Sequence, residues 1–257
     1  MRQLFVLLIA LGIWIPVNAK QITFTKQGVI HYHVSGQDVP VVQTALSLLE
    51  ADLYSVLEAK LVQGDLSSSQ LVIRTLASDS KDALAGKLQG FRVEEIDGKL
   101  YVTGADSQGT AYGIMELSRL LGVSPWVWWA DSTPAPLEKW VIANGFSTEQ
   151  TPAIPYRGIF INDEDNGFCP WSWKTFDPST VKGRVGPKTH KKVFELMLRL
   201  RANVFWPAMH NCSVPFFLTP DNQEMADRFG IIIGTSHCEP MLRNTNGEWK
   251  KTWSRRI

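Results

Sequence analysis

Acidic side chains follow a short apolar segment in the second half of the chain. Asp163, Glu164 and Asp165 come shortly after residues 157–161. Three adjacent acids repel one another when buried, so some of them must be paired, hydrogen-bonded or solvated. Glycoside hydrolysis needs one carboxylic acid to protonate the leaving oxygen and one carboxylate to direct water or attack, and one of these acids suits either task. Binding of sugar hydroxyls and a solvated acidic loop are the alternatives.

Two further polar groups follow the next two apolar segments. They are His210 and Asn211 after residues 203–206, and His237 and Glu239 after residues 231–234. Neighbouring parallel strands lie about 4.8 Å apart, so these groups are expected to face each other across one rim. A cationic imidazole beside an amide suits the carboxylate of a uronic acid. A metal site with the nearby cysteines is an alternative, but the spacing matches no structural zinc pattern. We therefore expect neither a metal nor a cofactor.

The elements that must position these groups alternate between strand and helix. The expected order is strand 157–161, helix 190–202, strand 203–206, helix 219–229 and strand 231–234. This alternation predicts a parallel sheet with right-handed crossovers. Each strand ends in a polar loop, which is where (β/α)₈ barrels carry their chemistry, and a full barrel takes about 250 residues. Residues 151–257 are therefore expected to be the first three βα units of an incomplete TIM-type barrel, in a fragment of a longer protein.

The first half of the chain has a different pattern. The expected elements are strands 21–24, 29–34, 71–75, 91–96 and 99–103 and helices 41–61 and 110–121. Asp97 and Gly98 predict a tight hairpin turn because both turn positions need positive φ. These elements make residues 20–150 a small N-terminal α/β sandwich domain. The prolines scattered through residues 122–155 predict a boundary, because proline breaks regular elements.

The first residues resemble an export signal. Arg2 gives a positive start, residues 4–16 are apolar, and Val17-Asn18-Ala19 offers small residues for a signal peptidase. This pattern predicts a signal peptide over residues 1–19 and a secreted or periplasmic protein. The apolar run is too short to span a bilayer comfortably. A membrane is therefore not expected as a partner after cleavage.

Composition excludes several other classes of function. The net charge is +1, so nucleic acid is not expected as a partner, since that would call for a clustered basic surface. Signature motifs of esterases, kinases, dehydrogenases and zincins are missing from the sequence.

Ten tryptophans could stack on sugar rings or pack in the core. Three cysteines cannot all pair within one chain, and buried, unreactive thiols are expected.

Longer motifs resemble glycoside hydrolase family 115. They are residues 104–113, 121–131, 156–164, 203–210 and 237–241, with Gly-Ile-Phe-Ile-Asn-Asp-Glu and Asn-Val-Phe-Trp-Pro-Ala-Met-His among them. The resemblance covers nearly all of the chain after residue 19. The first half also resembles the small α/β domain that precedes the barrel in several hexosaminidase-like families.

This resemblance implies an inverting α-glucuronidase that removes α-1,2-linked glucuronic acid, or its 4-O-methyl ether, from xylan. It implies Glu164 as a catalytic carboxylate and a general acid beyond residue 257. The substrate-binding residues that it implies are Asp163, Asp165, Trp206, His210, Asn211, His237, Glu239 and Trp249. The expected partner is xylan or a glucuronoxylo-oligosaccharide, and a homodimer of the full-length protein is left open.

Two other hypotheses fit the same sequence. The tryptophan content also suits a secreted carbohydrate-binding protein without catalysis. The chain as given could also be an inactive fragment, because an open three-stranded sheet leaves an unpaired edge.

Overall fold

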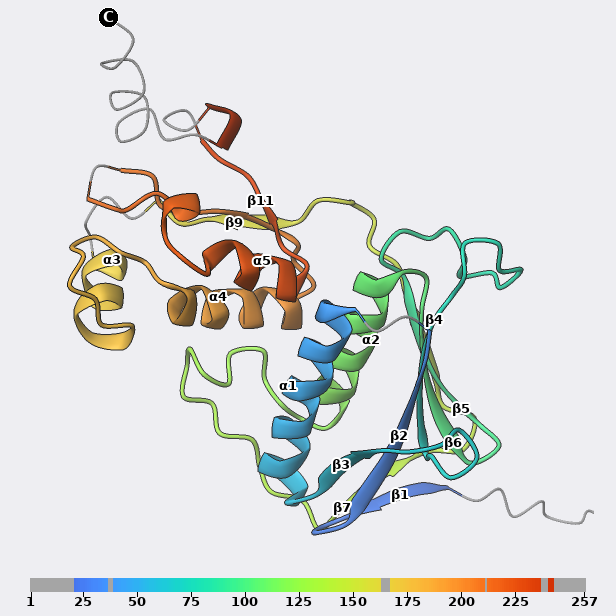
Figure 1. The fold of residues 1–257 in the computed structure, drawn as a ribbon. Coiled ribbons are helices and arrows are strands. Elements are labelled where there is room, and N and C mark those ends of the chain that lie inside the picture. The colour runs from blue at the N-terminus through green and yellow to red at the C-terminus, as the bar shows by residue number, and fades with distance from the viewer. Residues whose placement is uncertain (1–20, 37–38, 163–166, 211, 237–239, 243–257) are drawn as a thin grey trace, which may run out of the picture.

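A computed structural model describes residues 21–36, 39–162, 167–210, 212–236 and 240–242. The expected signal peptide lies outside these residues. So do the predicted site residues Asp163, Glu164, Asp165, Asn211, His237, Glu239 and Trp249. The described chain is a mixed α/β structure in which two helix layers lie between two sheets (Figure 1). No helix among the described residues is long and apolar enough to cross a membrane.

The first half contains a six-stranded sheet with the order β3-β2-β4-β6-β5-β8. Its strands are β2 (Val29–Ser35), β3 (Lys60–Gln63), β4 (Leu71–Thr75), β5 (Phe91–Ile96), β6 (Lys99–Gly104) and β8 (Ser147–Gln150). Strands β2, β3, β4 and β6 are parallel, whereas β5 is antiparallel to both β6 and β8. Asp97 and Gly98 both have positive φ between β5 and β6, which confirms the predicted hairpin.

Helices α1 (Pro40–Leu57) and α2 (Ser107–Leu120) cover one face of this sheet. They bury their apolar faces in the main core, where Leu49, Leu53 and Tyr112 are almost fully inaccessible. The predicted end of the first helix at residue 61 was wrong, because Glu58 adopts the left-handed conformation and closes α1. The second helix begins three residues earlier than predicted, because the Asp106 side chain accepts a hydrogen bond from the Gly109 amide and so caps the helix.

The proline-containing region 122–155 holds two strands that were not predicted. Strand β7 (Lys139–Ile142) pairs antiparallel with β1 (Ile22–Thr25). Strand β8 pairs with β5 at the edge of the six-stranded sheet. The region is therefore part of the folded first half, and the proposed domain boundary near residue 150 stays a prediction.

The second half contains a three-stranded parallel sheet with the order β11-β10-β9. Its strands are β9 (Gly158–Phe160), β10 (Val204–Trp206) and β11 (Ile232–Ile233). Helices α4 (Pro187–Arg199) and α5 (Asn222–Phe229) link them and cover one face. The parallel pairing confirms the sequence prediction. A short helix α3 (Phe168–Trp171) and a π-helical turn (Ser172–Phe176) after β9 were not predicted.

Ion pairs join the two helix layers. Arg199 of α4 donates two hydrogen bonds to the carboxylate of Asp52 on α1, at 2.7 and 3.0 Å. Arg199 also donates to Glu195, and all three side chains are almost completely buried. A second buried carboxylate, Glu116 on α2, accepts from Arg201, which follows α4. These contacts fix α4 against the first half of the chain.

Candidate active site at the strand ends

The carboxyl ends of β9, β10 and β11 lie at one edge of their sheet. Val204 is in register with both Gly158 and Ile232, and Trp206 is in register with Phe160. The segments that begin at residues 161, 207 and 234 therefore leave the sheet side by side. Each of them leads into one of the predicted polar groups, so the topology brings the three segments to one rim.

Trp206 and Phe160 form an exposed aromatic pair on the open face of this sheet. Their ring centroids are 5.8 Å apart with an interplanar angle of 65°. The Trp206 residue is 40% exposed, whereas the preceding Phe205 is fully buried against Phe194 of α4. Alternation along the strand accounts for this contrast. A half-exposed indole at the strand end suits stacking on a sugar ring.

His210 is partly exposed in the segment after β10. Its carbonyl accepts a hydrogen bond from the Ser213 amide at 2.9 Å. Next along the chain, Val214 donates to the Gly183 carbonyl at 2.8 Å. Gly183 has a φ of +81°, and a side chain at this position would collide with the Cys212 carbonyl. The chain after β10 is thus held closely against the chain after β9.

Cys169 of α3 adds a further link between these two segments. Its thiol lies 3.4 Å from the Gly183 carbonyl and 3.6 Å from the Cys212 carbonyl. Cys169 is fully buried, as expected, whereas Cys212 is partly exposed and Cys238 lies outside the described residues.

His190 and Asn222 form a buried polar pair beneath the same rim. His190 Nδ1 lies 3.2 Å from Asn222 Oδ1 and 3.2 Å from the Gly186 carbonyl. The ring is packed against three phenylalanines, Phe194, Phe205 and Phe216. This burial lowers the pKa of His190 to about 4, because desolvation disfavours the charged imidazolium. Sequence reasoning missed both residues as members of the site region.

Several tryptophans pack together beside α4. Trp171 stacks on Phe176 at 4.9 Å, and Trp128 lies 4.8 Å from Trp129 and 4.9 Å from Phe176. The Trp129 indole donates to the Lys192 carbonyl at 3.0 Å. For these tryptophans the structure favours packing between segments over sugar binding.

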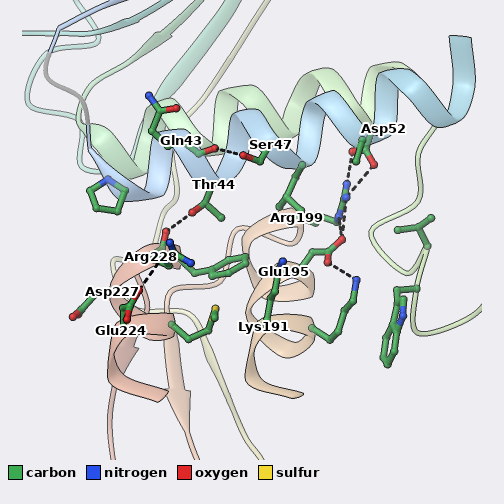
Figure 2. A pocket seen from close by; sticks show the side chains of 18 residues that line it. Gln43, Thr44, Ser47, Asp52, Lys191, Glu195, Arg199, Glu224, Asp227 and Arg228 are labelled. Atoms are coloured by element: carbon green, nitrogen blue, oxygen red, sulfur yellow. Dashed lines mark hydrogen bonds and ion pairs between the residues drawn. The ribbon is translucent and has the colours of Figure 1, made fainter. Parts of the chain in front are cut away.

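A separate hollow lies away from the strand ends (Figure 2). It is a groove of about 990 Å³ between α1, α4 and α5. Its carboxylates include Asp52 and Glu195, which bind Arg199, and Glu224, which pairs with Arg228. Each of these carboxylates forms an ion pair with an arginine that also lines the groove. The lining residues belong to helices α1, α4 and α5 and to residues 127–128, and none of them follows a strand of the parallel sheet. We therefore place the candidate active site at the strand ends and not in this groove.

No group of three or more His, Cys, Asp or Glu side chains that could hold a metal ion occurs among the described residues. The predicted site residues outside the described part of the chain are not covered by this finding. The expectation of a site without a metal therefore stays a prediction.

Comparisons with known proteins indicate a family. The family model described as glycosyl hydrolase family 115 matches residues 149–256. The structure of BtGH115A, described as a family GH115 4-O-methyl-α-glucuronidase with specificity for decorated arabinogalactans, is 49% identical with a TM-score of 0.84. The match covers 89% of this chain and 31% of BtGH115A, so this chain spans about a third of that protein.

More distant structures share the fold alone. Flavobacterium johnsoniae chitobiase is 14% identical with a TM-score of 0.55, and the match covers 88% of this chain and 34% of that one. A Streptomyces plicatus β-hexosaminidase is 13% identical with a TM-score of 0.56, over 85% of this chain and 43% of that one. No curated protein sequence matches the chain.

Proposed function

We propose, from the premise that this chain belongs to glycosyl hydrolase family 115, that the complete protein is an α-glucuronidase. It removes glucuronic acid, or its 4-O-methyl ether, from a decorated polysaccharide. The observation that carries this proposal is the 49% identity to BtGH115A over 89% of the chain. The meeting of three strand ends at one rim, each leading into acidic or histidine side chains, agrees with it.

The fold that we propose for the catalytic part is a (β/α)₈ barrel whose first three strands are β9, β10 and β11. Two observations support it: the strands are parallel, and their order in the sheet follows their order in the chain. Helices α4 and α5 cover the outer face, while Trp206 and Phe160 stand on the opposite face, which would line the barrel interior. Chemistry at the carboxyl ends of the strands is the rule for such barrels.

For the reaction we propose an inverting mechanism. Glu164 is the carboxylate that directs water at the anomeric carbon, and a general acid outside this chain protonates the leaving oxygen. In this arrangement the two carboxyl groups are about 6.5–9.5 Å apart, which leaves room for the water. Trp206 stacks on the sugar, while the uronic acid carboxylate is recognised by the histidine-bearing segments after β10 and β11.

The remaining predicted contacts belong to the same proposal. They are Asp163, Asp165, His210, Asn211, His237, Glu239 and Trp249. Residues 1–19 support export, so we propose a secreted or periplasmic enzyme.

Two decorated polysaccharides are candidate substrates. Xylan with α-1,2-linked glucuronic acid follows from the sequence resemblance. Decorated arabinogalactan is favoured by the specificity named for BtGH115A. Both share the terminal uronic acid, so the proposed site serves either of them, and the difference lies in contacts to the polymer chain.

The test uses the product of the complete open reading frame. The purified protein is incubated with glucuronoxylan, with uronic acid-decorated arabinogalactan and with undecorated xylan, and released sugars are identified by proton NMR. Release of glucuronic acid or its methyl ether, first as the β-anomer, is the expected result from at least one decorated polymer. Binding in calorimetry without any release would support the carbohydrate-binding hypothesis instead. First appearance of the α-anomer would contradict inversion.

A further inference from the structure

Two connections at the candidate site are joined by one buried amide. The first connection runs from β9 to α4, over residues 161–186, and it contains the predicted acids 163–165. The second runs from β10 to α5, over residues 207–221, and it contains His210. Asn222, the first residue of α5, donates to the Val185 carbonyl at 3.1 Å and to the Phe216 carbonyl at 3.3 Å. One side chain therefore holds the ends of both connections.

The hydrogen bonds fix the orientation of this amide. Both hydrogens of Asn222 Nδ2 are used by carbonyl acceptors, so Oδ1 is the atom that faces His190. His190 Nδ1 also faces the Gly186 carbonyl, so Nδ1 must carry the proton and donate. Asn222 has no exposed surface and His190 is 2% exposed. All N–H donors of the two side chains are hydrogen-bonded. Any other orientation of the amide or the ring would leave a buried polar group unpaired, which is costly, so the two side chains keep this orientation.

The pair lies at the point where the two connections already touch. Val214 donates to the Gly183 carbonyl, and the Cys169 thiol contacts both connections through Gly183 and Cys212. Cys169 lies only four residues after Asp165 in the sequence. On the other side, His190, Phe205, Pro207 and Ala208 line one small cavity, and residues 207–208 lead directly to His210. The pair is thus connected through short, buried contacts to the chain on both sides of the site.

We infer that Asn222 and His190 are positioning residues: they set the spacing between the connection that carries Glu164 and the connection that carries His210. This inference rests on the proposed function. Neither residue is placed in contact with substrate, so each acts through the loops. A misplacement of about 1 Å at reacting groups can cost roughly a hundredfold in rate. Loss of the amide should therefore lower kcat while leaving KM nearly unchanged.

The experiment uses two variants of the complete protein, Asn222→Leu and Asn222→Asp. Leucine removes every hydrogen bond of the amide. Aspartate keeps the acceptor for His190 but puts an oxygen in place of the donor to Val185 and Phe216, and it is nearly the same size. Both should lower kcat at least about tenfold, with KM changed by less than about threefold. Hydrogen exchange should rise in residues 177–186 and 212–218 and stay unchanged in β4 and β6.

A control variant separates positioning from a general loss of stability. The control is Ile73→Ala, which opens a void beside β4, where Ile73 is fully buried. All assays are run well below the melting temperature of each variant. An equal fall of kcat in Ile73→Ala would reduce the pair to a structural role and overturn the inference. Wild-type kcat with wild-type exchange in both Asn222 variants would overturn it as well.

The two proposals fail in different ways. If the wild-type protein released no uronic acid from any polymer, the proposed function would fail. Hydrogen exchange would then still decide the inference, because unchanged exchange in both connections would refute it without any assay of activity.

Discussion

Gly234 leaves the space that the indole of Trp206 occupies. A methyl group at Gly234 would collide with Nε1 and neighbouring ring atoms of Trp206. Trp206 is the last residue of β10 and Gly234 directly follows β11, where the Gly234 amide donates to the Phe205 carbonyl at 2.9 Å. The glycine therefore decides where the exposed indole stands at the strand ends.

In the proposed site Trp206 stacks on the sugar. Gly234→Ala in the complete protein should displace the indole and therefore lower kcat/KM for the decorated polymer about tenfold or more. The free energy of unfolding should fall by about 1–3 kcal/mol, the usual cost of overpacking. Initial rates and urea unfolding measure the two effects. Gly64→Ala is the matched control, because the nearest atoms to its added carbon lie 3.5 Å away. Wild-type kcat/KM in Gly234→Ala would separate Trp206 from substrate binding.

Removal of one partner of the Asp52–Arg199 pair should destabilise the protein strongly. In Asp52→Asn, Glu195 is the one carboxylate that the buried guanidinium of Arg199 keeps as a partner within the described part of the chain. The expected loss is about 3–5 kcal/mol in urea unfolding, because the remaining charge is buried and poorly compensated. Replacing both residues together, as Asp52→Leu with Arg199→Met, should recover most of this loss.

The exposed pair between Glu224 and Arg228 is the control for this prediction. Its side chains are 67% and 58% exposed, so Glu224→Gln should cost no more than about 0.5 kcal/mol. Equal effects of Asp52→Asn and Glu224→Gln would show that the link between α1 and α4 contributes little to stability.

His190 should make the protein sensitive to mild acid. Its pKa is about 4 in the folded state against 6.5 for the free side chain, so the unfolded chain binds the proton first as pH falls. The contribution of neutral His190 to the free energy of unfolding is fully present above pH 6.5 and is lost as pH falls toward 4. It amounts to about 3 kcal/mol.

The measurement is urea unfolding between pH 7 and pH 4 for the wild type and for His190→Gln. The difference between the two stability curves isolates His190 from carboxylates that titrate in the same range. His190→Gln should be less stable at pH 7 and should lose less stability on acidification. Parallel curves for the wild type and His190→Gln would contradict the prediction.

The sequence predicted the parallel strands because each apolar segment ends in a polar loop and a helical pattern separates it from the next. Strand β3 was missed because Leu61 continues the apolar spacing of α1 beyond the residue that ends it. Strand β8 reads Ser-Thr-Glu-Gln and has no apolar face of its own, so only its pairing with β5 makes it a strand. Tertiary context overrides local propensity in such cases.

The candidate site was predictable only in part. The meeting of the three strand ends was predictable, because topology alone brings the ends of parallel strands together. The His190–Asn222 contact joins residues 32 positions apart, and no spacing in the sequence indicates it. Likewise, a glycine that makes room for Trp206 looks like any other glycine until β10 and β11 are paired.

The measurement that tests the central claim most directly is release of glucuronic acid by Glu164→Gln in the complete protein, beside Glu224→Gln as an exposed control on α5. If Glu164 is the catalytic carboxylate, its variant should keep the wild-type melting temperature and lose about 10²–10⁴-fold in kcat, while the control keeps wild-type activity. Near wild-type release of glucuronic acid by Glu164→Gln would remove Glu164 from the reaction and contradict the proposed mechanism.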